Sequence, residues 1–294
     1  TEPPRPLRAG RLRRFRAALL EWYGSRARPL RIRATREPWA ILVSEVMAQQ
    51  TQIARVDEAW TGFVARYPEP RVLAEAPTAE VLRAWAGLGY NRRALHLQRA
   101  AAAIEHEHGG HVPSNVAELE ALPGVGPYTA RAVAAIAFGQ PVAAVDTNVR
   151  RVVTRVAGAA LGPTALQAEA DVWVARTDPA TWTHASMELG ATVCVARGPR
   201  CDECPVARWC ASAGQVVTMP SRDPATSVPF EQTTRWLRGR IIERLRGLGD
   251  GAWTRLPASI GQHDEAAVAA AVAALEREGM LEHRADGAVR LPSG

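Results

Sequence analysis

The chain has 294 residues, of which 47% are hydrophobic and 22% are charged, a composition typical of folded domains rather than disordered chains. This length suffices for one large or two modest domains. The longest apolar runs, such as residues 132–138, are too short to cross a bilayer. The N-terminal segment is rich in arginine and lacks the apolar core of a secretion signal. We therefore expect a cytoplasmic protein without a membrane-spanning segment.

All of the permanently positive side chains are arginines, because the 36 Lys+Arg residues include no lysine. Eleven of them lie within residues 1–36, against two glutamates, so this segment carries +9 while the whole chain carries +6. A basic segment ahead of a nearly neutral body favours a polyanion such as DNA as the partner. A solvated arginine tail without a partner would have the same composition.

Apolar periodicity indicates helices throughout the first 212 residues, and alternating strand patterns are nearly absent before residue 250. The longest periodic segment covers residues 39–67. The other expected helices cover residues 11–22, 79–86 (capped by Thr78), 92–107, 114–122, 128–138, 147–157, 164–176 and 180–193. The pattern predicts an all-α body built from short helices.

Residues 213–231 interrupt this periodicity with proline, glycine and serine, and we interpret them as a linker. Beyond the linker, residues 233–246 and 264–278 have a helical period. Residues 281–291 alternate around Asp286-Gly287, a pair suited to a tight hairpin turn. These elements predict a winged-helix-like α+β module at 232–294. A small α+β cap on the main domain is an equally weighted alternative.

Four cysteines lie within seventeen residues, at Cys194, Cys201, Cys204 and Cys210, with the spacing C-x6-C-x2-C-x5-C. Two disulfides would suit a secreted protein, for which no signal is visible. One tetrahedral zinc ion also takes four thiolates, although zinc sites usually pair them as two short knuckles and only Cys201 and Cys204 form one. A [4Fe-4S] cluster takes four thiolates at separate corners. The spacing alone leaves zinc and the cluster open.

The segment LPGVGPYTA, residues 122–130, links two expected helices. Its two glycines allow a tight turn with outward-facing backbone N–H groups, which together with the next helix N-terminus form a site for a phosphate oxygen. An ordinary turn between helices would also contain glycine. The candidate DNA-binding residues of this hairpin are Leu122, Gly124, Val125, Gly126 and Thr129.

Two acidic residues stand out by their sequence context. Asp146, in VDTNVRRV, lies where a helix N-terminus is expected, and an aspartate there is most often an N-cap. Glu45, in SEVMAQQTQ, lies inside an apolar helical stretch, where burial of a carboxylate is costly. Glu45 therefore lies either on a solvated face or in a working cleft.

The ordered set SEVMAQQTQ, GLGY, LPGVGPYTA, VDTNVRRV, MELGATVC and the four cysteines resembles the helix–hairpin–helix DNA glycosylases with an iron–sulfur loop, and among them the MutY type. The resemblance covers residues 11–212. It implies a two-lobed all-α domain at 1–212 with a base-binding cleft between the lobes, and a [4Fe-4S] cluster held by loop 194–210. It also implies a monomeric base-excision-repair enzyme of the bacterial nucleoid. The implied partner is double-stranded DNA that contains a mispair or an oxidised guanine.

The resemblance also implies catalytic roles at matching positions. Glu45 corresponds to an acid that protonates N7 of adenine, and Asp146 to an aspartate that stabilises the sugar cation. Tyr128 occupies an active-site position after the hairpin, and Asn148 supports the aspartate. Paired carboxyl groups cleave glycosidic bonds through an oxocarbenium-like sugar, and the base must first leave the helical stack.

Other matching positions concern the contact with DNA and the base pocket. Residues that match those entering the duplex near the flipped base are Gln49, Gln50 and Thr51, and Glu188 matches an acid of the adenine pocket. Three positions depart from the family pattern: Ile32 stands where a pocket tryptophan is common, Ala48 where leucine is usual, and Asn91 where an aromatic residue that wedges into the duplex is often found. The segment after residue 213 is also too short for the family's domain that reads 8-oxoguanine.

The related endonuclease III uses a lysine amine to form a Schiff base and then cuts the strand, and that lysine falls at position 128. This chain has Tyr128 there and no lysine elsewhere, so only the N-terminal amine could form such an adduct. We therefore expect a monofunctional glycosylase that removes adenine opposite guanine or 8-oxoguanine.

Two alternatives follow from the departures. One is a mismatch glycosylase directed at thymine or uracil opposite guanine. The other is a non-catalytic DNA-binding protein on the same scaffold. The second alternative is disfavoured because a scaffold has no need of two costly carboxyl groups in a cleft.

Overall fold

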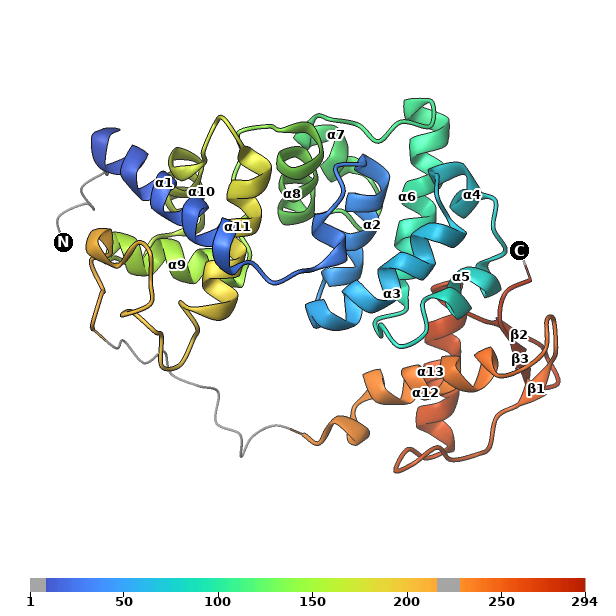
Figure 1. Ribbon diagram of the computed structural model, residues 1–294. Helices are drawn as coiled ribbons and strands as arrows, with labels where there is room; N and C mark the ends of the chain where they lie inside the picture. Colours follow the sequence, from blue (N-terminus) through green and yellow to red (C-terminus); the bar gives the residue numbers. More distant parts are fainter. Residues whose placement is uncertain (1–8, 216–227, 294) are drawn as a thin grey trace. The chain divides into compact units, whose positions relative to one another are not determined.

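The computed structural model describes residues 9–215 and 228–293, and these are mostly helical, as the sequence predicts (Figure 1). The α-helices of the described ranges are α1 (Ala9–Arg26), α2 (Pro38–Ala48), α3 (Ile53–Arg66), α4 (Pro70–Ala74), α5 (Thr78–Ala84), α6 (Arg92–His108), α7 (Val116–Ala121), α8 (Pro127–Phe138), α9 (Thr147–Ala157), α10 (Pro163–Trp173), α11 (Pro179–Thr192), α12 (Thr234–Arg246) and α13 (Glu265–Arg277). The strands are β1 (Thr254–Arg255), β2 (Glu282–His283) and β3 (Ala288–Arg290). The sequence did not indicate α4 or β1.

The expected continuous segment at 39–67 is wrong, because the chain forms two helices with a turn between them. Helix α2 ends at Ala48 and α3 begins at Ile53. Gln50 has a φ of 56°, a left-handed conformation that a helix cannot contain. Both helices bury an apolar face, so the periodicity continues across the turn, and no glycine or proline marks the break. The expected cap at Thr78 is also wrong, since Pro77 is the N-cap of α5.

The chain divides into two compact units, which interleave along the sequence. The first contains the chain up to Glu45, then Ser114–Ala121, and then the chain from Val125 through the cysteine-rich loop. The second contains Val46–Pro113, Leu122–Gly124 and the described C-terminal residues from 228 onward. The boundaries that we expect from the sequence, at 212 and 232, are not tested by this division and stay a prediction. Residues 216–227 of the expected linker lie outside the described residues.

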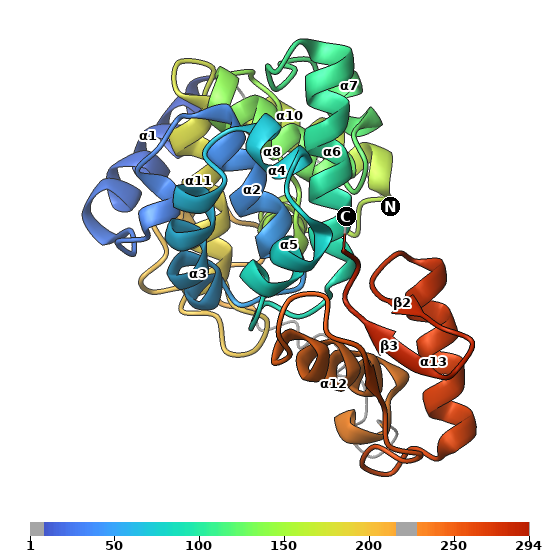
Figure 2. The same cartoon turned by 90° about the vertical axis from the view of Figure 1, so that its right-hand side faces the viewer.

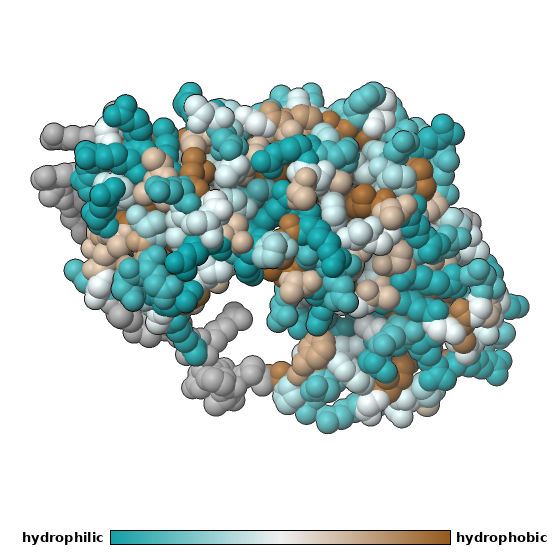
Figure 3. Space-filling model, in the orientation of Figure 1, coloured by the Kyte–Doolittle hydropathy of each residue, from teal (hydrophilic) through white to brown (hydrophobic). Residues whose placement is uncertain are grey.

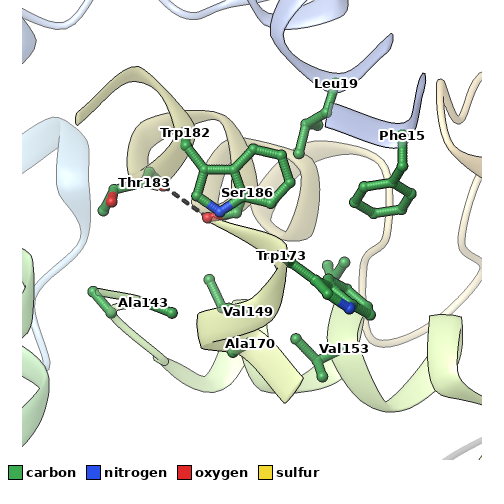
Figure 4. A pocket seen from close by; sticks show the side chains of 12 residues that line it. Phe15, Leu19, Ala143, Val149, Val153, Ala170, Trp173, Trp182, Thr183 and Ser186 are labelled. Atoms are coloured by element: carbon green, nitrogen blue, oxygen red, sulfur yellow. Dashed lines mark hydrogen bonds between the residues drawn. The ribbon is translucent and has the colours of Figure 1, made fainter. Parts of the chain in front are cut away.

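The core of the first unit forms where α1 packs against α11 and α11 packs against α9. Figure 4 shows Phe15 of α1 facing Trp173 and Trp182, and its ring centroid lies 5.1 and 6.1 Å from theirs. These rings and Val149 line an apolar cavity of about 20 Å³. Because Val149 belongs to the first turn of α9, this core fixes the end of the helix that carries Asp146.

In the second unit, α4 and α5 pack against α6, and the C-terminal module packs against α5 through α12 (Figures 1 and 2). The three strands form an antiparallel sheet in the order β1-β3-β2, in which Val289 pairs with Thr254 on one side and with His283 on the other. The predicted hairpin is confirmed, and Gly287 supplies the positive φ of 83° that its turn requires.

The face of the molecule in Figure 3 is largely hydrophilic, with hydrophobic residues in small separate areas. Among the described helices, none is long and apolar enough to cross a membrane.

Candidate active site and cysteine loop

Glu45 lies in the apolar helix α2, and its side chain is removed from water. The residue is 9% exposed, and its Oε2 atom has no hydrogen-bond partner among the described residues. Burial raises the pKa of the Glu45 carboxyl from its ordinary 4.5 to about 7; a hydrogen bond with Tyr128 opposes this rise and the charge of Asp146 adds to it. A large share of Glu45 is therefore protonated at neutral pH and can act as an acid.

Asp146 is the N-cap of α9, as its sequence context indicates. Its Oδ1 accepts a hydrogen bond from the backbone N–H of Val149 at 2.6 Å, and its Oδ2 accepts one from Nδ2 of Asn148 at 2.9 Å. The cap thus fixes a half-buried carboxylate close enough to Glu45 to influence its protonation.

Tyr128, in the first turn of α8, completes this group. Burial and the charges of Glu45 and Asp146 raise the pKa of its phenol well above 10, so the hydroxyl keeps its proton. The hydroxyl also contacts Sδ of Met187 at 3.8 Å. The structure therefore brings Glu45, Asp146, Tyr128 and Asn148 together from three helices. Two carboxyl groups at one site are the arrangement that glycosidic bond cleavage uses.

A chain of hydrogen bonds runs from Asp146 along α9 to the cysteine loop. Oδ1 of Asn148 accepts a hydrogen bond from Arg151 at 2.8 Å, and the same guanidinium donates to the carbonyl oxygens of Gly190 and Cys194, both at 2.6 Å. A Cβ atom at Gly190 would lie 2.7 Å from Cβ of Asn148, so only glycine permits this close approach of α11 to α9. Sequence reasoning missed Arg151, although it lies inside the VDTNVRRV motif.

The four cysteines line a single cavity of about 30 Å³ at the other end of α9. All four are free and half-buried. The loop is fastened to α9 by Arg155, which donates to the carbonyl oxygen of Val195 at 2.8 Å and lies 3.3 Å from Sγ of Cys194. The loop returns to the helix end at Ala211, whose N–H donates to the carbonyl oxygen of Val156.

The chemistry of these four side chains fits an iron–sulfur cluster better than a single zinc ion. A tetrahedral zinc ion would hold its sulfur ligands roughly 4 Å from one another. In the described ranges, no three His, Cys, Asp or Glu side chains are arranged to hold one ion. Burial and the other three cysteines raise the pKa of the Cys204 thiol to about 11, so four thiolates here need a bound positive centre. A cluster with its irons at separate corners meets both conditions.

The two glycines of the hairpin differ in what requires them. Gly124 has a φ of 79°, and a Cβ atom there would lie 2.6 Å from Cβ of His96, so the fold itself demands glycine. Gly126 has an ordinary φ of −98° and is the N-cap of α8. No heavy atom lies within 4 Å of a Cβ built on Gly126, which leaves this helix end open to an approaching group. Val125, Leu122 and Thr129 are buried.

The turn after α2 and the GLGY turn are held by one buried arginine, which sequence reasoning missed. Arg93 donates to the carbonyl oxygen of Met47 at 2.6 Å and to Oγ1 of Thr51 at 2.9 Å. It also donates to the carbonyl oxygens of Leu88 and Gly89, at 3.1 and 3.0 Å. In the described chain, Gln50 and Tyr90 are the non-glycine residues with positive φ, and they belong to these two turns. Strained backbone of this kind gathers at functional sites.

Glu188 is fully buried in α11 and carries two ion pairs. Its Oε1 accepts a hydrogen bond from Nε of Arg28 at 2.7 Å, and its Oε2 accepts one from Arg33 at 2.6 Å. These hydrogen bonds and charges hold the pKa of Glu188 at about 2 although burial acts in the opposite direction. Glu188 thus anchors the segment that contains Ile32 to α11. Its expected role in the base pocket stays a prediction.

His184, one helical turn before Glu188, is a second polar group that sequence reasoning missed. It is 9% exposed, and its Nε2 atom has no hydrogen-bond partner among the described residues. Burial, followed by the charges of Arg33 and Arg36, lowers the pKa of His184 to about 3, so the ring is neutral. Buried polar atoms without partners are uncommon, and the two on Glu45 and His184 both lie in the first unit.

A helical fold with a Gly-Val-Gly hairpin, paired carboxyl groups and a four-cysteine loop defines a class of DNA repair proteins. The family model of the HhH-GPD superfamily base excision DNA repair protein matches residues 43–176. The adenine DNA glycosylase of Mycobacterium tuberculosis is 45% identical over 238 residues, covering 78% of this chain and 77% of that protein. The adenine DNA glycosylase of Mycolicibacterium smegmatis is 41% identical over 285 residues, covering 92% and 93%.

Among solved structures, a thermostable thymine-DNA glycosylase matches with a TM-score of 0.66 and 29% identity, over 69% of this chain and 96% of that one. The chain therefore belongs to the HhH-GPD superfamily of base excision DNA repair proteins, which confirms the resemblance.

The raised pKa of Glu45 predicts a pH-dependent effect of Glu45→Gln on stability. The folded protein keeps a proton on Glu45 that the unfolded chain releases between pH 4.5 and about 7, so the free energy of unfolding falls as the pH rises through this window. The neutral glutamine avoids this loss, and we expect it to stabilise the protein by roughly 3 kcal/mol at about pH 8 and little at about pH 5. Urea denaturation of both proteins at the two pH values measures the difference. A pH-independent difference would show that Glu45 titrates normally.

Proposed function

We propose that this protein is a monofunctional DNA glycosylase that removes adenine opposite guanine or 8-oxoguanine and acts on duplex DNA as a monomer. The observation that carries the proposal is the buried Glu45 carboxyl, with its pKa near 7, beside the capped carboxylate of Asp146. The adenine DNA glycosylase relatives match this chain over most of its length and support adenine as the base.

In the proposed reaction, protonated Glu45 gives its proton to N7 of an adenine that has left the helical stack. The protonated base is a better leaving group, and the bond between its N9 and the sugar C1′ breaks with both electrons going to the base. The Asp146 carboxylate stabilises the oxocarbenium-like sugar until water adds at C1′ and gives its proton to the Glu45 carboxylate, which restores the acid. The products are free adenine and an abasic sugar in an intact strand.

Two local features supply the DNA contacts in this proposal. The open helix end at Gly126 and the hairpin N–H groups bind a phosphate, and the strained turn at Gln50 enters the duplex near the flipped base. Because phosphate contacts position the protein and carry no base identity, recognition of the base depends on the pocket residues.

A thymine- or uracil-directed enzyme is the second candidate, and Ile32 is the observation that favours it. Ile32 is buried in the short 3-10 helix Arg31–Arg33, where relatives of the adenine type commonly have a tryptophan. Loss of a stacking ring costs about 1–3 kcal/mol per base. The similarity to a solved thymine-DNA glycosylase agrees with this candidate.

We also propose that Cys194, Cys201, Cys204 and Cys210 hold a [4Fe-4S] cluster. Their shared cavity, their mutual effect on the Cys204 pKa and the Arg155 guanidinium beside Cys194 support this assignment. The cluster supplies structural cross-linking of the loop, and the loop in turn supplies the Cys194 carbonyl that Arg151 binds.

The cluster assignment predicts a brown protein with broad visible absorbance and about four irons per chain. Anaerobic purification followed by iron and zinc analysis measures this. A colourless protein with one zinc ion per chain and full activity would contradict the assignment.

The proposed reaction predicts the outcome of a base-release panel with A, T or U placed opposite G or 8-oxoguanine. Adenine should be released faster than the pyrimidines, because they lack N7. Glu45→Gln should lower adenine release by about 10²–10⁴-fold, since glutamine cannot deliver the proton. Duplex binding by this variant should remain. Faster release of T or U would favour the second candidate, and a wild-type rate in Glu45→Gln would refute the acid role.

The absence of lysine predicts that the product strand stays intact until alkali or heat is applied. Borohydride should trap little covalent protein–DNA adduct, because Tyr128 cannot form a Schiff base. Gel electrophoresis of the labelled strand before and after alkali separates the two products. Efficient trapping after the N-terminal amine has been blocked would overturn the monofunctional assignment.

A further inference from the structure

Two exposed aromatic rings meet at one arginine in the second unit. Arg235, in the first turn of α12, donates a hydrogen bond to the hydroxyl of Tyr90, and its guanidinium lies 5.0 Å from the centroid of the Tyr90 ring. The same guanidinium lies 4.9 Å from the ring centroid of Phe230. We call Tyr90, Phe230 and Arg235 the aromatic edge. Of five exposed large hydrophobic residues in the described ranges, two belong to it, with Tyr90 37% and Phe230 49% exposed.

Arg93 holds Tyr90 in place. Its φ of 45° is uncommon for a bulky residue. The turn before it is held by the hydrogen bonds of Arg93 to Leu88 and Gly89, and the Arg93 guanidinium also lies 5.6 Å from the Tyr90 ring centroid. A strained backbone that presents an aromatic ring to solvent is expected where a ligand later covers the ring.

The charge of Arg235 contacts two aromatic rings but has no acidic partner among the described residues. The N-terminal turn of a helix favours negative charge, yet the first turn of α12 contains this arginine and no acidic residue. Arg235 forms no ion pair with a carboxylate in the described part of the chain, whereas Arg240 on the same helix pairs with Glu243 at 2.7 Å. The bond to Tyr90 uses one of five guanidinium N–H groups. The remaining donors are suited to a phosphate.

The other candidate surface of the module does not suit DNA. In a winged helix, the helix before the hairpin is the one that enters the groove, and here that helix is α13. Its exposed residues are Glu265, Ala266, Ala269, Ala270, Glu276 and Arg277. This face has two acidic residues, Glu265 and Glu276, against one basic residue, Arg277, so its net charge repels a phosphate backbone.

We propose that the C-terminal module binds duplex DNA through the aromatic edge and not through α13. Arg235 binds a backbone phosphate, while Tyr90 and Phe230 pack against the sugars or bases beside it. The inference rests on the proposed function, in which duplex DNA is the substrate. In this proposal the DNA interface includes the GLGY turn, through Tyr90, and the C-terminal module, through Phe230 and Arg235.

The experiment compares Arg235→Gln with Arg240→Gln, two variants that remove the same charge from exposed positions on one helix. Fluorescence anisotropy measures the binding of each full-length protein to a duplex with one A opposite G, over a series of salt concentrations. Arg235→Gln should weaken binding severalfold and reduce the salt dependence of log K by about one. Phe230→Ala should weaken binding severalfold with an unchanged salt dependence. Arg240→Gln should behave as wild type.

Thermal unfolding measures whether the three variants remain folded. We expect midpoints close to that of the wild type, because all three side chains are exposed. Single-turnover base release at saturating protein should equal that of the wild type, since the edge does not touch the reacting atoms. Equal effects of Arg235→Gln and Arg240→Gln would overturn the proposal, as would unchanged DNA binding by all three variants. If the wild-type protein released no base, the proposed function would be refuted. The proposal about the aromatic edge would stand, because duplex binding is measured separately.

Discussion

The burial of the Glu45 carboxyl is the physical constraint on which the chemistry proposed for this protein depends. Helix α2 places the residue among neighbours such as Leu42 and Val43, which have no exposed surface. Removal from water favours the protonated form. Asp146, which is only half-buried, receives two hydrogen bonds at the start of α9. Two similar carboxyl groups thus have different surroundings, and this difference is the basis of the separate roles that we propose for them.

Helix α9 joins these roles to the cysteine loop. Asp146 caps its N-terminus, while Arg151 and Arg155 donate hydrogen bonds to the backbone around Cys194. Arg151 also holds Asn148, which in turn holds Asp146. The position of the Asp146 carboxylate therefore depends, through Asn148 and Arg151, on the cysteine loop, although that loop makes no direct contact with the carboxylate in this chain of hydrogen bonds.

Features that the sequence predicted depend on local patterns, and features that it missed depend on distant contacts. Periodicity predicts most helices, and the identity of Asp146 predicts its cap. The cysteines lie within seventeen residues, so their common cavity follows from spacing. The pairing of Glu188 with Arg28, 160 residues away, has no local signal. The turn at Gln50 has none either, because its left-handed backbone depends on hydrogen bonds made nearby by Arg93, from another helix.

The proximity of Glu45 to Asp146 differs from these features in how it could be predicted. Neither periodicity nor composition places these residues together, and only the family resemblance predicted it. The physical reason is that Glu45 and Asp146 are far apart in the chain, and single-sequence patterns do not encode the tertiary packing that brings them close enough to interact. The buried state of Glu45 was one of two outcomes that the sequence allowed, and the structure selects the buried one.

The shared dependence of two turns on Arg93 also limits how this protein can change. The Arg93 guanidinium donates hydrogen bonds to backbone carbonyl oxygens at both the Gln50 turn and the Tyr90 turn, and to the hydroxyl oxygen of Thr51. Substitutions within one turn therefore alter the support of the other, and their free energies do not add. A sequence change that moves the backbone of one turn therefore requires a compensating change in the other, because one guanidinium must keep its acceptors in both.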